Sequence, residues 1–198
     1  MKNLVTGFIF LFAVNSLLFS QQKGNFEKVI DFGTFSREIA FYVPHSYSDS
    51  KDYPLIIGMH PAQTPAFYMR NMLGMAGQEL EAIVACPEGP DGDGKAIMPL
   101  VDWCKQEYSI DSKKIILTGY SAGGIPTFKE GTENYETFRG LIGIAPVVYE
   151  YQVNLDAVDK IPIGIIIGKE DHLYDPVKTT VEFLEDSNAV IHMIEKDG

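Results

Sequence analysis

A pentapeptide in the middle of the chain, Gly119-Tyr120-Ser121-Ala122-Gly123, constrains the fold more than any other feature. Residues 114–118 before it are a short β-branched apolar run, typical of a buried parallel strand, and residues 124–130 after it favour a helix. A strand that turns into a helix through G-x-S-x-G holds the serine on a strained elbow, where glycines avoid clashes in the turn. The pattern therefore predicts a serine nucleophile exposed above a sheet. The alternative is a glycine-rich turn whose serine only caps the helix.

The rest of the chain alternates strand-like and helix-like segments, which predicts an α/β fold. Its later strands are apolar throughout, as expected of a mostly parallel, doubly wound sheet with helices on both faces. Strands are expected at 37–43, 55–59, 82–85, 114–118, 140–144, 161–167 and 189–194, and helices at 65–77, 97–108, 125–130 and 176–186. Without a linker, repeat or low-complexity tract, the sequence indicates one domain over residues 21–198.

Residues 1–20 have the pattern of a signal peptide. Lys2 is followed by an apolar stretch over 4–19 and by the small residue Ser20 at the expected cleavage point. An uncleaved membrane anchor is disfavoured, because Asn15 interrupts a run that is already short for a bilayer span. We therefore predict a secreted or periplasmic protein with no membrane partner.

The formal net charge of the chain is −11, which argues against nucleic acid or anionic membrane surfaces as partners. The turn-rich loop 89–95 contains Asp-Gly-Asp-Gly, but Lys95 stands where a third calcium ligand would be needed. No metal is therefore expected. Cys86 and Cys104 could pair in an oxidising compartment, although two buried thiols are the favoured interpretation.

A serine nucleophile requires a base to take its proton and a carboxylate to orient that base. Asp171 follows the apolar run 161–167 and should lie at the same sheet edge as Ser121. Glu170 and Asp175 compete for this role, but Glu170 should face the opposite way and Asp175 should cap the following helix. Asp171 is the predicted acid.

An oxyanion hole requires two backbone N–H donors. Ala122, directly after the serine, is expected to supply the first. The second should come from the loop after residues 55–59, and because Pro61 has no N–H we assign it to Ala62 rather than Gln63. His60 precedes the serine and is expected to brace this loop.

Together these segments resemble the α/β-hydrolase superfamily. The similarity extends over 37–44 with Tyr47, 54–60, 110–111, 114–124 and 168–171, and is greatest to secreted esterases related to polyhydroxybutyrate depolymerases and feruloyl or acetylxylan esterases. The resemblance implies Ser121 as nucleophile, Asp171 as acid, Ala62 and Ala122 as oxyanion donors, and no cofactor. The chain departs from the family in having His60-Pro61 where His-Gly is usual.

A second departure concerns the catalytic histidine, which the family places in a loop after the last strand. Here His192 lies inside the expected last strand, His172 is expected at the rim, and His45 has no assigned role. An apolar last strand without a covering helix is unusual in natural folds. We therefore expect the natural domain to continue beyond Gly198 with a histidine and a helix.

The sequence predicts a secreted serine esterase that cleaves a small-molecule or polymer-linked carboxylic ester through an acyl-enzyme on Ser121. A peptidase of the same fold is the first alternative, and a non-catalytic binding module that lacks the histidine is the second. Tyr149, Tyr151 and Tyr174 could stack on a sugar or phenolic ring of the substrate, or could simply pack.

Overall fold

A computed structural model describes residues 21–90 and 92–197, so the signal-peptide prediction concerns residues outside the described part. One sheet of eight strands runs through this part in the order β1-β2-β4-β3-β5-β6-β7-β8. The strands are β1 Gly24–Asp31, β2 Ser36–Val43, β3 Tyr53–Met59, β4 Ile83–Pro87, β5 Ile110–Tyr120, β6 Gly140–Ile144, β7 Ile163–Gly168 and β8 Ile191–Lys196.

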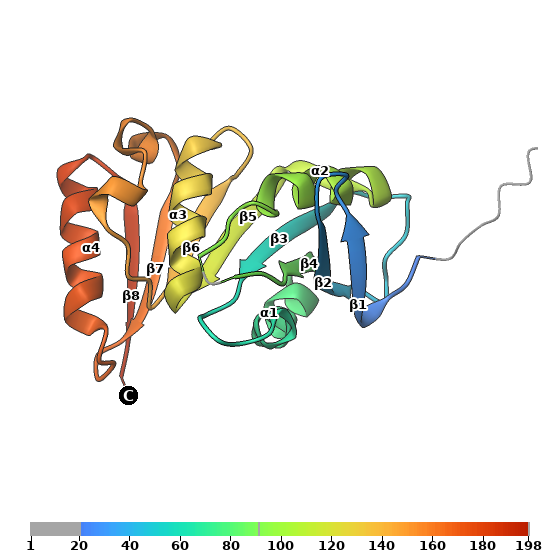
Figure 1. Ribbon diagram of the computed structural model, residues 1–198, viewed down its shortest axis with the longest axis horizontal. Coiled ribbons are helices and arrows are strands. Elements are labelled where there is room, and N and C mark those ends of the chain that lie inside the picture. Colours follow the sequence, from blue (N-terminus) through green and yellow to red (C-terminus); the bar gives the residue numbers. More distant parts are fainter. Residues whose placement is uncertain (1–20, 91, 198) are drawn as a thin grey trace, which may run out of the picture.

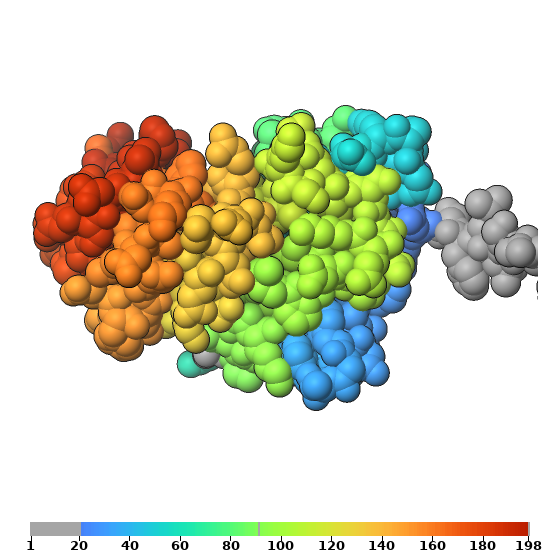
Figure 2. All heavy atoms as spheres, turned by 90° about the horizontal axis from the view of Figure 1, so that it is seen from above, coloured from blue at the N-terminus to red at the C-terminus, as the bar shows by residue number. Residues whose placement is uncertain are grey.

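Six of these strands run parallel to one another. The antiparallel pairs are confined to one end, where β1 pairs with β2 and β2 with β4. From β4 to β8 every neighbouring pair is parallel. In Figure 1 the sheet extends from the blue β1–β2 hairpin on the right to the red β8 on the left, and Figure 2 shows the same two ends from above. The carboxyl ends of six strands therefore meet at one edge, where open α/β sheets bind ligands.

Helices cover both faces, as the sequence predicts. They are α1 Ala66–Glu79, α2 Ile97–Glu107, α3 Gly124–Glu133 and α4 Tyr174–Asp186, with 3₁₀ turns η1 Ser121–Gly123, η2 Glu150–Gln152 and η3 Leu155–Lys160. Helix α1 packs on β2, β3 and β4, whereas α3 packs on β5 and β6 and α4 on β7 and β8. In Figure 1, α3 and α4 lie in front of the half of the sheet that ends in β8.

The alternation of side chains along β3 shows how the two faces are separated. Leu55 and Ile57 are buried in the larger core with α2, α3 and α4, while Ile56 packs with Met69 and Leu73 of α1 on the other face. Successive residues of a strand point to opposite faces, so a continuous apolar run can serve both layers.

The two cysteines lie in different layers. Cys86 on β4 belongs to the α1 layer and Cys104 on α2 to the larger core, and both are free and buried. With the sheet between them, their sulfur atoms cannot approach disulfide distance. The interpretation as two buried thiols is confirmed.

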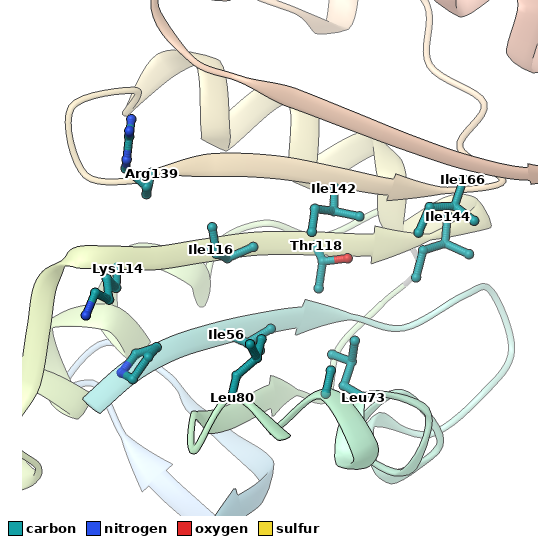
Figure 3. Close-up of a pocket in the computed structure, with 12 residues that line it drawn as sticks. Ile56, Leu73, Leu80, Lys114, Ile116, Thr118, Arg139, Ile142, Ile144 and Ile166 are labelled. Atoms are coloured by element: carbon teal, nitrogen blue, oxygen red, sulfur yellow. The ribbon is translucent and has the colours of Figure 1, made fainter. Parts of the chain in front are cut away.

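Beyond α1, the same face of the sheet is open. A mainly apolar cavity of about 580 Å³ lies there, lined among others by Ile56, Ile116, Ile142, Ile144 and Ile166. Figure 3 shows these side chains on adjacent strands, with Lys114 and Arg139 at the end where β5 and β6 begin. Within the part of the chain that the structure describes, no helix packs over this half of the face.

Candidate active site

The elbow at Ser121 has the predicted geometry. Strand β5 ends at Tyr120, η1 spans the next three residues, and α3 begins at Gly124. Ser121 adopts a φ of +52°, in the left-handed region that a residue with a side chain rarely occupies. Such a conformation costs about 1–3 kcal/mol and is most often retained at functional sites.

The flanking glycines are required by close backbone contacts. A Cβ atom at Gly119 would lie 2.1 Å from the carbonyl oxygen of Gly123, and one at Gly123 would lie 2.3 Å from the carbonyl oxygen of Met59. Neither backbone oxygen can move independently of its strand or turn. The elbow is therefore pressed against the end of β3, which continues into the loop that contains Ala62.

Ser121 does not serve as a helix cap. Neither η1 nor α3 has a side-chain capping hydrogen bond at its amino end. The carbonyl oxygen of Gly123 instead accepts a hydrogen bond of 2.8 Å from the Thr127 hydroxyl inside α3. The alternative interpretation of Ser121 as a helix cap is therefore wrong.

The loop after β3 is tightly organised. The carbonyl oxygen of Pro61 accepts a hydrogen bond of 2.9 Å from the Thr64 hydroxyl and lies 2.9 Å from Nδ1 of the buried His60. Gln63 has a φ of +58°, so this turn is also strained. His60 braces the loop, as expected, and Ala62 lies between the two fixed positions.

Glu88, at the end of the neighbouring strand β4, connects this loop to α1. One of its carboxylate oxygens accepts the backbone N–H of Ala66 at 2.7 Å, and the other lies 3.9 Å from Nε2 of His60. A carboxylate at the amino end of a helix is favoured by the helix dipole. Glu88 thus holds the loop through Ala66 and His60, and neither of these contacts involves Ser121.

Asp171 closes the turn between β7 and α4. One of its carboxylate oxygens accepts the backbone N–H of Leu173 at 2.9 Å, and its carbonyl oxygen accepts that of Tyr174 at 2.9 Å. Helix α4 begins at Tyr174, two residues earlier than predicted, and has no side-chain cap. The expectation that Asp175 caps this helix is therefore wrong, because Asp175 already lies in the first turn.

A cavity of about 550 Å³ lies at the carboxyl edge of the sheet, between the elbow and the Asp171 turn. Tyr120 lines it from the elbow side, Ala145 from the end of β6, Asp171 from the turn, and Lys196 from the end of β8. Glu170 also lines this cavity, so the expectation that it faces the opposite way from Asp171 is not met. Both carboxylates thus remain candidates for the acid.

None of the histidines in the described residues lines this cavity. Nδ1 of His172 lies 3.2 Å from a carboxylate oxygen of Asp171, but the His172 side chain is 87% exposed. His192 is exposed on β8, paired with Gly164 of β7, and His45 lies beside Gly24 at the start of β1. The structure thus brings Ser121 and Asp171 to one sheet edge and leaves the base unassigned.

The loop that follows β4 is held by charged groups of the chain itself. A carboxylate oxygen of Asp93 lies 2.9 Å from the Arg37 guanidinium, and the other accepts the Lys95 backbone N–H at 2.9 Å. Burial opposes ionisation of Asp93, but these two contacts outweigh it and lower its pKa.

No group of three or more His, Cys, Asp or Glu side chains in residues 21–90 and 92–197 could hold a metal ion. None of the helices in that part is long and apolar enough to cross a bilayer.

Comparison with known proteins gives esterases as relatives. No protein-family model matches the chain. A probable acetylxylan esterase A of Aspergillus niger is 23% identical over 128 residues, which cover 54% of this chain and 42% of that protein. A bifunctional acetylxylan esterase/xylanase of Neocallimastix patriciarum is 28% identical over 104 residues, 46% of this chain and 15% of that protein. The chain thus spans less than half the length of these relatives.

Solved structures give the same result for the fold. A poly(3-hydroxybutyrate) depolymerase from Bordetella parapertussis superposes with a TM-score of 0.74 at 14% identity, over 89% of this chain and 85% of that chain. A ferulic acid esterase superposes with a TM-score of 0.71 at 12% identity, over 89% and 91% of the two chains. The sheet order, the serine elbow and these similarities together show that this chain has the α/β-hydrolase fold and is related to esterases that share it.

Proposed function

We propose that the protein is a serine esterase that cleaves carboxylic esters through an acyl-enzyme on Ser121. The observation that carries the proposal is the strained serine at the elbow, next to Tyr120, which lines the same cavity as Asp171. Ser121 is half-buried and keeps a positive φ that a glycine would adopt without strain. Such strain is most often retained where the side chain has a function.

In the proposed reaction, the Ser121 hydroxyl oxygen attacks the ester carbonyl and its proton passes to a base. The backbone N–H groups of Ala122 and Ala62 stabilise the negative oxygen of the tetrahedral intermediate. When the intermediate collapses, the carbon–oxygen bond to the alcohol breaks and the alcohol leaves with the proton. Water then hydrolyses the acyl-enzyme by the same steps and restores Ser121.

The base in this reaction is a histidine that Asp171 orients. Lys196, at the end of β8, lines the cavity, and its carbonyl oxygen accepts the Lys169 N–H at 2.8 Å. The ammonium group of Lys169 also lies 2.7 Å from the Asp197 carboxylate. The end of β8 is therefore anchored beside the Asp171 turn.

The proposed setting is outside the cytoplasm, on the basis of the leader-like sequence of residues 1–20. An ester carried on a polymer is the substrate type that such a setting favours. A non-catalytic binding module would have no need of the strain at Ser121. A peptidase would share the elbow and differ in its substrate.

Hydrolysis of p-nitrophenyl acetate tests this proposal, with the protein expressed from its complete natural reading frame. Ser121→Ala should leave at most about a thousandth of the activity, because only binding and oxyanion contributions remain. Ser36→Ala, at an exposed serine of β2, is the matched control and should keep full activity. Equal rates for the two variants would refute the proposal, and faster cleavage of peptide p-nitroanilides than of esters would favour the peptidase.

A further inference from the structure

Two exposed tyrosines form a parallel pair on the segment after β6. The side chain of Tyr149 is 56% exposed and that of Tyr151 is 82% exposed. Their ring centroids are 5.7 Å apart and their planes differ by 6°. This is an offset stack, which leaves the outer ring face and part of the inner one open to solvent.

Neither ring contributes to the core. Both are absent from the side chains packed against either hydrophobic cluster, although Val153 and Leu155 of the same segment are packed there. Leaving apolar ring surface in water forgoes about 25 cal/mol for each Å². Folding therefore gives no reason for two aromatic rings at these positions.

The backbone that carries the rings is nevertheless fixed. The Tyr149 N–H donates to the Gln152 side-chain oxygen at 3.0 Å, and the Gln152 N–H donates to the Tyr149 carbonyl at 2.8 Å. Before this turn, the Thr180 hydroxyl of α4 donates to the Val148 carbonyl at 3.2 Å. After it, the Asn154 N–H donates to the Thr132 hydroxyl of α3 at 3.0 Å. A surface held in this way can bind a ligand without first being ordered.

The pair follows the carboxyl end of β6, four residues after Ala145 in the chain. Helices α3 and α4 hold the segment that carries it, whereas Tyr68 and Met72 of α1 line the cavity at the carboxyl edge. The rings therefore form a surface of their own on the side of α3 and α4.

The surroundings of the rings select the type of ligand. Glu150, Gln152 and Asn154 supply polar groups next to them, and residues 145–159 contain acidic but no basic side chains. Aromatic faces carry partial negative charge and attract polarised C–H groups, while the polar groups suit hydroxyls. An anionic polymer would be repelled by these acidic side chains.

We propose that Tyr149 and Tyr151 form a binding platform for a neutral polysaccharide, on which pyranose rings stack. The platform is separate from the residues assigned to catalysis, so this proposal does not depend on the proposed function.

Binding is measured in the Ser121→Ala background, so that the result does not depend on turnover. Isothermal titration with β-1,4-linked xylohexaose should give saturable binding. Tyr151→Ala should weaken it at least tenfold, since it removes the more exposed of the two stacking rings. Tyr151→Phe keeps the ring and should bind like the parent, as should Val29→Ala, which truncates an exposed apolar side chain on β1.

Failure to bind xylohexaose at millimolar concentration, or equal affinity in Tyr151→Ala and the parent, would overturn the platform. Self-association of the parent that Tyr151→Ala abolishes, detected by light scattering, would also overturn it and assign the pair to a protein interface. An inactive enzyme that still binds the sugar through Tyr151 would refute only the esterase proposal.

Discussion

At the scale of single residues, the geometry of the elbow at Ser121 is set by backbone conformation and backbone contacts more than by side chains. The positive φ of Ser121 and the close approach of Gly119 and Gly123 to backbone oxygens are three parts of one turn. The contact between Gly119 and Gly123 is local to the pentapeptide, whereas Gly123 approaches Met59 of the neighbouring strand β3. Because the turn itself is local, the elbow could be predicted from the sequence alone.

Gly123→Ala tests whether this close approach sets the geometry of the site. A Cβ atom 2.3 Å from the Met59 carbonyl oxygen must displace β3 or the elbow. We expect a loss of stability of about 1–3 kcal/mol and a loss of ester hydrolysis of about a hundredfold or more. Gly74→Ala in α1 is the control, since its Cβ meets nothing within 4 Å and should stabilise the helix slightly. Both effects are read from thermal unfolding and the ester assay, and wild-type activity in Gly123→Ala would contradict this view.

Asp171→Asn tests the identity of the acid. The amide oxygen can still accept the Leu173 N–H, so the turn should survive, but the residue can no longer stabilise a protonated imidazole. Turnover should fall by about four orders of magnitude with little change in KM. Asp175→Asn and Glu170→Gln should change turnover by less than about threefold. If Glu170→Gln lowered turnover strongly and Asp171→Asn left it unchanged, Glu170 would be the acid instead of Asp171.

The sequence alone does not predict which histidine faces the cavity. The place of each histidine along the chain says little about this, because the direction of its side chain depends on the packing of distant elements. His172 lies beside Asp171 in sequence and in space, yet it points into solvent. The parallel stack of Tyr149 and Tyr151 likewise depends on contacts from α3 and α4 that no local pattern encodes.

At the scale of secondary structure, apolar strands were easier to predict than mixed ones. Strand β6 has the predicted bounds, and the other parallel strands lie within a few residues of theirs. Strand β1 was missed, because its exposed positions include Glu27 and Lys28 and its apolar residues are too few to give a pattern. It forms through pairing with β2 at the edge, which is a tertiary effect.

The layered arrangement of strands and helices makes a prediction about the cysteines. Burial raises the pKa of the Cys86 and Cys104 thiols well above the ordinary value, so thiolate is scarce in the folded state. In the native protein at pH 8, both should react with a disulfide reagent far more slowly than a free thiol. Both should react at once in denaturant. Rapid modification of either thiol in the folded protein would contradict the layer assignment.

At the scale of the whole molecule, the open face of β5–β7 is the largest departure from a sheet covered on both sides. Lys114 and Arg139 border it at the end where β5 and β6 begin, and mainly apolar side chains such as Ile116 and Ile142 line the rest. Apolar surface left in water there forgoes about 25 cal/mol of stabilisation for each Å².

The exposure of this face is tested with the dye ANS, which reports accessible apolar surface. The native protein should bind ANS. Ile142→Asp should reduce that binding with little loss of stability, because the carboxylate stays in contact with water. A large fall in the unfolding temperature of Ile142→Asp would contradict an open face.

The central claim is that Ser121 is the nucleophile, and covalent trapping tests it most directly. The protein from the complete natural reading frame is incubated with a fluorophosphonate, which forms a stable bond with an activated serine oxygen, and the modified peptide is located by mass spectrometry. The account predicts one adduct, on the peptide that contains Ser121, and none in Ser121→Ala. An adduct on any other residue, or an unmodified Ser121 in a protein that hydrolyses esters, would contradict it.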